Sequence, residues 1–69
     1  MKFGEIIKKE RKERNITLQD VGDFVGVHRS TVVRWEKGDI KNISCVHAIK
    51  LLDLFNLPLS TLRLLDDLN

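Results

Sequence analysis

The sequence predicts an all-α fold with five helical segments, because no stretch of its 69 residues has the pattern of a strand. Apolar residues recur at steps of three and four, as on the buried face of a helix. Glycine, asparagine and proline interrupt this pattern, and such residues commonly mark turns. These breaks predict helices at about 2–14, 18–25, 29–37, 45–55 and 59–68.

The first segment carries a narrow apolar stripe made of Phe3, Ile6 and Ile7, and most of its other residues are charged. A stripe of this width predicts a helix that buries one side against a core. The KKERKER stretch within it mixes both signs of charge. We therefore interpret that stretch as a solvated helix face and not as a nucleic-acid patch.

The second and third segments have the pattern of a helix-turn-helix at about 18–37. Thr17 is a good N-cap for the second segment, and Asp20 stands three residues later, as in a capping box. A turn of three to four residues between two helices needs a corner residue that accepts positive φ, and Gly26 stands at that corner. The residues expected to pack inward are Val21, Val25, Val27, Val32 and Trp35.

The fourth and fifth segments are rich in leucine. The fourth begins after Ser44, a plausible N-cap, and the fifth begins after Pro58. The expected buried face of the fourth segment comprises Cys45, Ala48, Ile49, Leu52 and Phe55. The leucines in excess of what a small core can cover are Leu51, Leu54, Leu59, Leu64 and Leu68. This surplus indicates a protein partner or a missing C-terminal domain.

Length and composition exclude several classes of function. We expect one domain over residues 1–69, with a core at about 3–65. One cysteine allows no internal disulfide, and Cys45 does not form a zinc pattern with His28 and His47. We expect His47 to be solvated. No arrangement of nucleophile, paired carboxylates or phosphate-binding glycines is present, so we expect no catalytic residues, no metal, no cofactor and no enzyme activity.

The basic residues are concentrated in the part of the chain that holds the helix-turn-helix. Residues 1–42 contain ten Lys and Arg and seven Asp and Glu, a net charge of +3, whereas residues 43–69 contain two and three, a net charge of −1. No apolar run approaches the roughly 20 residues of a membrane span, and no signal peptide is recognisable. We therefore expect a cytoplasmic protein that does not bind membranes.

Several short motifs follow one another in a fixed order along the chain. They are Ile7 with Arg11, Ile16-Thr17, Gly26-Val27, Ser30-Thr31-Val32, Arg34-Trp35-Glu36-Lys37-Gly38 and Leu57-Pro58-Leu59. Together they resemble the lambda-repressor-like (Cro-type, XRE) family of helix-turn-helix DNA-binding domains. This resemblance implies a compact five-helix domain that binds double-stranded DNA as a homodimer. The GDIKN stretch also resembles phage-type repressors that carry a further domain, so the chain is either a short regulator or part of a longer one.

The resemblance and the exposed face of the third segment together predict two groups of DNA contacts. The expected base contacts are Arg29, Ser30, Val33 and Arg34, with Arg34 placed for guanine and Val33 for a thymine methyl group. The expected phosphate contacts are Thr17, Leu18, His28, Lys37, Lys41 and Asn42, of which the first two act through backbone N–H groups at a helix N-terminus.

Three residues differ from the usual family pattern. Leu18 replaces a glutamine that touches phosphate in the family, His28 replaces a serine N-cap, and Gly22 replaces an alanine inside the helix. The resemblance also implies a structural ion pair between Arg11 and Glu36, which would hold the third helix against the first.

These patterns predict a sequence-specific DNA-binding transcriptional regulator, most simply a repressor that binds an operator as a dimer. The alternative is a protein-interaction module on the same fold, such as an antitoxin-like or antirepressor-binding partner. The modest net charge of +2 and the leucine-rich end favour this alternative. Binding of the isolated chain to DNA would distinguish the two.

Overall fold

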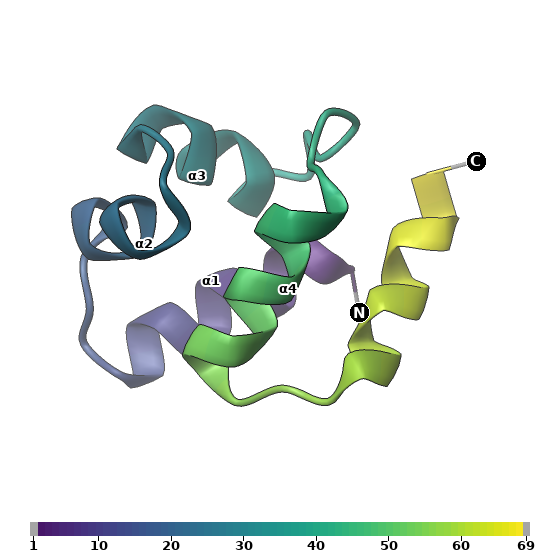
Figure 1. Ribbon diagram of the computed structural model, residues 1–69. Coiled ribbons are helices and arrows are strands. Elements are labelled where there is room, and N and C mark those ends of the chain that lie inside the picture. The colour runs from purple at the N-terminus through teal and green to yellow at the C-terminus, as the bar shows by residue number, and fades with distance from the viewer. Residues whose placement is uncertain (1, 69) are drawn as a thin grey trace.

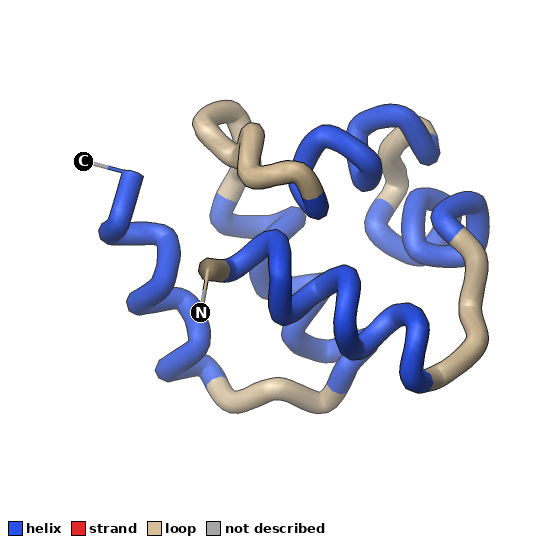
Figure 2. The backbone as a smooth tube through the Cα atoms, turned by 180° about the vertical axis from the view of Figure 1, so that it is seen from behind, coloured by secondary structure: helices blue, strands red, loops and turns tan. Residues whose placement is uncertain are grey.

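The computed structural model describes the backbone of residues 2–68 and the side chains of residues 2–65. Its elements are α1 (Phe3–Glu13), α2 (Leu18–Val25), α3 (Arg29–Glu36), α4 (Cys45–Phe55) and the 3-10 helix η1 (Leu59–Leu68). The predicted all-α fold is confirmed, and no strand occurs in the part of the chain described. Figures 1 and 2 place α2 and α3 at one side of the molecule and η1 at the other.

The ends of α2 form as the sequence predicts. Thr17 Oγ1 accepts a hydrogen bond from Asp20 N (3.0 Å), and Asp20 Oδ2 accepts one from Thr17 N (3.0 Å). The bond donated by Thr17 N favours the ionised carboxylate, so it lowers the pKa of Asp20 below its ordinary value. At the other end Gly26 is left-handed, with φ at 90°, and its N–H donates to Gly22 O (2.8 Å). The helix-turn-helix corner therefore depends on a glycine.

Two other glycines allow close contact between backbone segments. A Cβ atom at Gly22 would lie 2.6 Å from Val27 O, so α2 packs directly against the turn that follows it. A Cβ atom at Gly4 would lie 2.1 Å from Trp35 O, so the start of α1 packs directly against the end of α3. Glycine at both positions sets how closely α3 approaches its neighbours.

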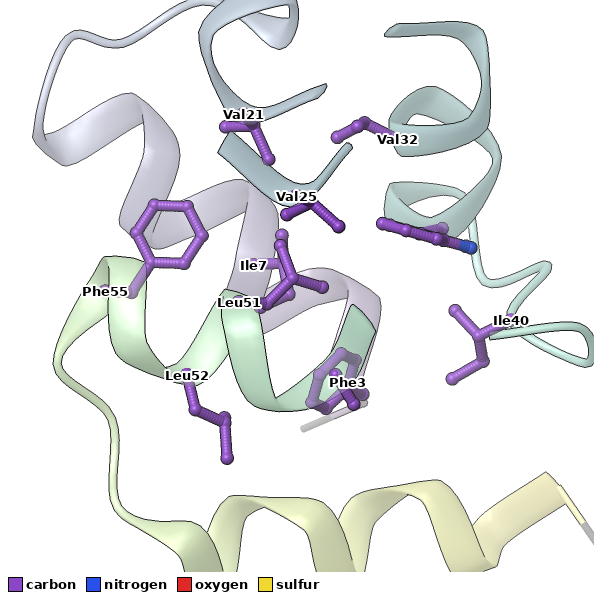
Figure 3. Close-up of a cluster of buried hydrophobic side chains, with 11 residues drawn as sticks. Phe3, Ile7, Val21, Val25, Val32, Ile40, Leu51, Leu52 and Phe55 are labelled. Carbon is purple, nitrogen blue, oxygen red and sulfur yellow. The ribbon is translucent and has the colours of Figure 1, made fainter. Parts of the chain in front are cut away.

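The four α-helices enclose one hydrophobic core, which Figure 3 shows in close-up. Helices α1, α2, α3 and α4 each contribute side chains, and Ile40 adds one from the loop between α3 and α4. The buried residues are Phe3, Ile7, Val21, Val25, Val32, Trp35, Ile40, Ala48, Leu51, Leu52 and Phe55. Leu62 and Leu65 of η1 pack against this core from outside. Residues from both helices of the helix-turn-helix thus share a core with α1 and α4.

The ion pair between Arg11 and Glu36 is present. Arg11 Nε donates to Glu36 Oε2 (2.7 Å) and Arg11 Nη2 donates to Glu36 Oε1 (3.1 Å), which makes the contact bidentate. The side chains are only 13% and 6% exposed, and Arg11 Nη1 also donates to Ile16 O (3.3 Å). The hydrogen bonds to Glu36 raise the pKa of the Arg11 guanidinium above its ordinary value. This pair joins α1 to the last residue of α3.

A second arginine, Arg14, which caps the C-terminal end of α1, holds the end of α4. Arg14 Nη2 donates to Phe55 O (2.8 Å), and its guanidinium carbon lies 5.4 Å from the centre of the Phe55 ring. A cation near the last carbonyl groups of a helix satisfies an unpaired acceptor and complements the helix dipole. Helix α1 and its C-cap residue therefore contact the C-terminal ends of both α3 and α4 through arginines.

The prediction for the buried face of α4 was partly wrong. Cys45 is exposed and Ile49 is 40% exposed, although both were expected in the core. Leu51, which was counted among the surplus leucines, is completely buried. The buried face follows the spacing Ala48, Leu51, Leu52 and Phe55, which turns Cys45 and Ile49 toward solvent.

The predictions for His47 and for the leucine surplus also need correction. His47 is partly buried rather than solvated, because its ring packs beside Trp35 at a centroid distance of 5.6 Å, and its Nδ1 is buried without a hydrogen-bond partner. Leu54 and Leu64 are partly buried against the core, whereas Leu59 is 68% exposed. The Leu68 side chain lies outside the described residues. Most of the expected surplus is therefore absorbed by the fold.

The close approach at Gly22 predicts that alanine is unfavourable there. Gly22→Ala should lower the free energy of unfolding by about 1–2 kcal/mol, because the added methyl group forces the turn to move. Helix propensity alone predicts the opposite, a gain of up to about 1 kcal/mol. Urea unfolding followed by circular dichroism measures the difference, with the exposed-site variant Lys8→Ala as the control. Equal or greater stability of Gly22→Ala would contradict the close approach.

The buried pair predicts strong coupling between α1 and α3. Arg11→Ala and Glu36→Ala should each lower the free energy of unfolding by about 3 kcal/mol, because each leaves the other charge buried without a partner. The double variant Arg11→Ala/Glu36→Ala should lower the free energy of unfolding by much less than the sum of the two single changes. A double-mutant cycle measured by urea unfolding tests this. The exposed Lys9–Glu13 pair is the matched control, with an expected coupling under about 1 kcal/mol. Additive costs at Arg11 and Glu36 would contradict the assignment.

Candidate nucleic-acid interface

An open groove lies between the N-terminal end of α2 and the outer face of α3. Its lining residues are Thr17, Leu18, Gln19, Arg29, Ser30 and Val33. Five of these six were predicted to contact DNA, and the structure brings them together from two elements. The groove exists because the turn at Gly26 places the first turn of α3 beside the first turn of α2. Both helix N-termini therefore flank one surface, and backbone N–H groups at such ends favour anions.

His28 caps α3 in place of the serine usual in the family. Its Nδ1 accepts a hydrogen bond from Ser30 N (3.1 Å), and Ser30 Oγ lies 2.9 Å from the same nitrogen. An imidazole nitrogen that accepts a backbone N–H must be unprotonated, so the ring hydrogen belongs on Nε2. The ring is exposed. His28 therefore fixes the first turn of α3 through Nδ1 and leaves Nε2 as a donor toward the surface.

The two arginines of α3 are both exposed but differ in their surroundings. Arg34 Nε and Nη2 both lie 3.2 Å from Asp39 Oδ2, and the two side chains are 56% and 49% exposed. An exposed pair of this kind contributes less than about 1 kcal/mol, so another acceptor can replace Asp39 readily. Among the described residues Arg29 makes no ion pair. Arg29 borders the groove, whereas Arg34 lies one turn further along the helix.

The basic loop after α3 is held by a buried residue. Lys37 is the C-cap residue that follows α3, Gly38 comes next with φ at 101°, and Ile40 is 4% exposed in the core. Lys41 and Asn42 come directly after Ile40 and are exposed. Figures 1 and 2 show this loop leading from the end of α3 to the start of α4. The three predicted phosphate contacts of this loop are therefore separate from the groove and lie near the opposite end of α3.

Two groove residues differ from the sequence expectation. Val33 is partly buried rather than fully exposed, because it faces the groove. Gln19 was not among the predicted contacts, yet it lines the groove, and its Nε2 donates to Asp23 Oδ1 (2.9 Å). The sequence contains no local signal for this placement of Gln19, because it depends on how α3 crosses α2.

Other kinds of site find no support in the described residues. No group of three His, Cys, Asp or Glu side chains in that part of the chain could hold a metal ion. None of its helices is both long enough and apolar enough to cross a membrane.

Comparison with known proteins agrees with this geometry. The family model described as Helix-turn-helix matches residues 7–62, a span that includes α2, α3 and α4. Proteins from Saccharolobus islandicus and Saccharolobus solfataricus, each named "Putative HTH-type transcriptional regulatory protein", are 42% identical over 50 residues, which is 72% of this chain. A protein of the same name from Halorubrum lacusprofundi is 41% identical over 58 residues, or 84% of the chain.

These matches cover a small part of the relatives. The chain spans only 16% of the Saccharolobus proteins and 17% of the Halorubrum protein. No solved structure matches it significantly. The family match extends over most of the chain and includes both helices that form the groove. The chain belongs to the XRE-type helix-turn-helix family of DNA-binding domains.

Proposed function

We propose that this chain is a sequence-specific, double-stranded DNA-binding domain that regulates transcription and has no enzymatic activity. Helix α3 would enter the major groove, with Arg29, Ser30, Val33 and Arg34 at the base edges. The observation that carries this proposal is the exposed outer face of α3 beside the N-terminal end of α2, with both helices packed on one core. A rigid helix that presents arginines to solvent matches the width and hydrogen-bonding pattern of the major groove.

The proposed phosphate contacts flank α3 on two sides. The N-terminal end of α2, at Thr17 and Leu18, and the outward Nε2 of His28 lie on one side. Because the Thr17 N–H already donates to Asp20 Oδ2, the backbone donor proposed for phosphate at this end is the N–H of Leu18. Lys37, Lys41 and Asn42 lie beyond the other end of α3. Contacts on both sides would orient α3 along the groove without reading sequence, since phosphates carry no base information.

The proposed mode of action is repression by a homodimer that binds an operator. A two-fold dimer reads two half-sites about 10 base pairs apart. The names of the relatives refer to transcriptional regulation and favour a regulatory role. Selection of random duplex DNA by the purified chain, followed by sequencing, tests the proposal. An enriched inverted repeat is the expected result, whereas no enrichment at low salt would contradict it.

A protein-interaction role on the same fold is the second candidate. Val46 is 60% exposed and Leu59 is 68% exposed, and neither lines the groove between α2 and α3. Exposed large apolar residues favour a protein partner when they adjoin one another. This role is compatible with DNA binding, and it becomes the leading function only if the isolated chain does not bind DNA.

Phosphate contacts predict strong dependence on salt. If about 4–6 phosphates are neutralised per dimer, log K should fall with log salt concentration at a slope of about −4 to −5. Lys41→Ala should weaken binding to all sequences alike and make the slope shallower by about 1 per protomer. Fluorescence anisotropy with labelled duplexes at several salt concentrations measures both quantities. Lys8→Ala on α1 is the matched control, and an unchanged slope for Lys41→Ala would contradict the assignment.

The position of Arg34 predicts a specific loss of base discrimination. Arg34→Ala should relax the preference at one base pair per half-site by about 1–3 kcal/mol, because a bidentate contact to guanine is lost. Asp39→Asn is the informative companion variant, since it removes the acid that competes for Arg34 and should keep the same preferred base. Repeating the DNA selection with both variants makes the comparison. An unchanged preferred sequence for Arg34→Ala would show that Arg34 does not contact a base.

A further inference from the structure

The groove between α2 and α3 is lined by four polar and two aliphatic residues. Thr17 Oγ1 accepts from Asp20 N (3.0 Å), and Gln19 Nε2 donates to Asp23 Oδ1 (2.9 Å). Ser30 Oγ lies 2.9 Å from His28 Nδ1. Three of the four polar side chains therefore already hold intramolecular partners. A ligand that enters the groove therefore meets two aliphatic side chains among polar groups whose orientations are already fixed, together with Arg29.

The two aliphatic residues come from different elements. Leu18 is the first residue of α2, and its partly buried side chain packs against the core. Val33 is on the second turn of α3 and is also partly buried. Packing limits the movement of Leu18, and a β-branched side chain such as valine has few rotamers in a helix. The two therefore form a fixed apolar surface on the face of the domain that is proposed to meet DNA.

Only one unmodified base presents an apolar group in the major groove. Thymine carries a methyl group at C5, whereas the corresponding position of cytosine carries hydrogen. We infer that Leu18 and Val33 together form a contact site for the C5-methyl group of a pyrimidine, so that the domain prefers thymine or 5-methylcytosine at that position. The inference rests on the proposed DNA-binding function and adds a side-chain role for Leu18, whose backbone N–H still faces phosphate.

Removing single methyl groups from the DNA tests this inference directly. In the operator obtained by selection, each thymine of the half-site is replaced in turn by uracil, which keeps every hydrogen-bonding group. Loss of one buried methyl contact should weaken binding about fourfold, and loss in both half-sites about 15-fold. At the same position cytosine should bind more weakly than 5-methylcytosine by a similar factor. Uracil in place of thymines outside the half-sites is the DNA control.

Protein variants then identify the residues that contact the methyl group. The uracil effect is the factor by which binding weakens when thymine is replaced by uracil. It should fall to less than twofold in Leu18→Ala and in Val33→Ala, because these variants have already lost the contact to the methyl group. Circular dichroism checks that each variant is folded, and Val33→Ala keeps the test valid if Leu18→Ala is unstable, because Val33 lies outside the core cluster. Phe24→Ala is the matched control, because Phe24 is an exposed apolar residue of α2 that does not line the groove.

The possible results separate this inference from the proposed function. An enriched operator that has no thymine in its half-sites, or that tolerates uracil at every thymine, would overturn the methyl contact and leave DNA binding established. A uracil effect of full size in both Leu18→Ala and Val33→Ala would overturn the assignment to these residues. Failure to enrich any operator would contradict the proposed function, and the inference with it.

Discussion

The position of α3 depends on its contact with α1. The bidentate pair between Arg11 and Glu36 joins the two helices at 2.7 and 3.1 Å, and Gly4 allows the start of α1 to touch the backbone at Trp35. Both contacts fix the last turn of α3, and the turn at Gly26 fixes where the helix begins. Because both ends of α3 are fixed by buried or backbone contacts, its outer face can vary without loss of the fold.

This arrangement separates residues that hold α3 from residues that could read DNA. Val32 and Trp35 point into the core, whereas Arg29 and Arg34 are exposed on the same helix. Within the groove, the polar side chains from α2 and α3 mostly bond to their own helices or caps. Specificity would therefore come from two chemically different parts of one face, the arginines and the aliphatic pair of Leu18 and Val33.

The sequence was sufficient to predict the local structure and the family, but not the details of packing. Thr17, Gly26 and Ser44 act through neighbouring backbone groups, so their positions in the sequence were enough to predict their roles. All five segments lie within one residue of the predicted bounds. Cys45 and His47 were placed wrongly, because the rotation of α4 is set by contacts distant in sequence. Likewise, the groove that includes Gln19 depends on the crossing of α2 and α3, which no local pattern encodes.

The most direct test of the central claim, that the face formed by α3 and the start of α2 meets DNA, is an NMR titration of the isotope-labelled chain with a selected operator duplex. The account predicts that amide shifts change most at Thr17 and Leu18, along α3 and in the loop that carries Lys41 and Asn42. The amides of η1, which lies on the other side of the molecule, should change little (Figure 1). Changes confined to η1 and the exposed side of α4 would contradict the account.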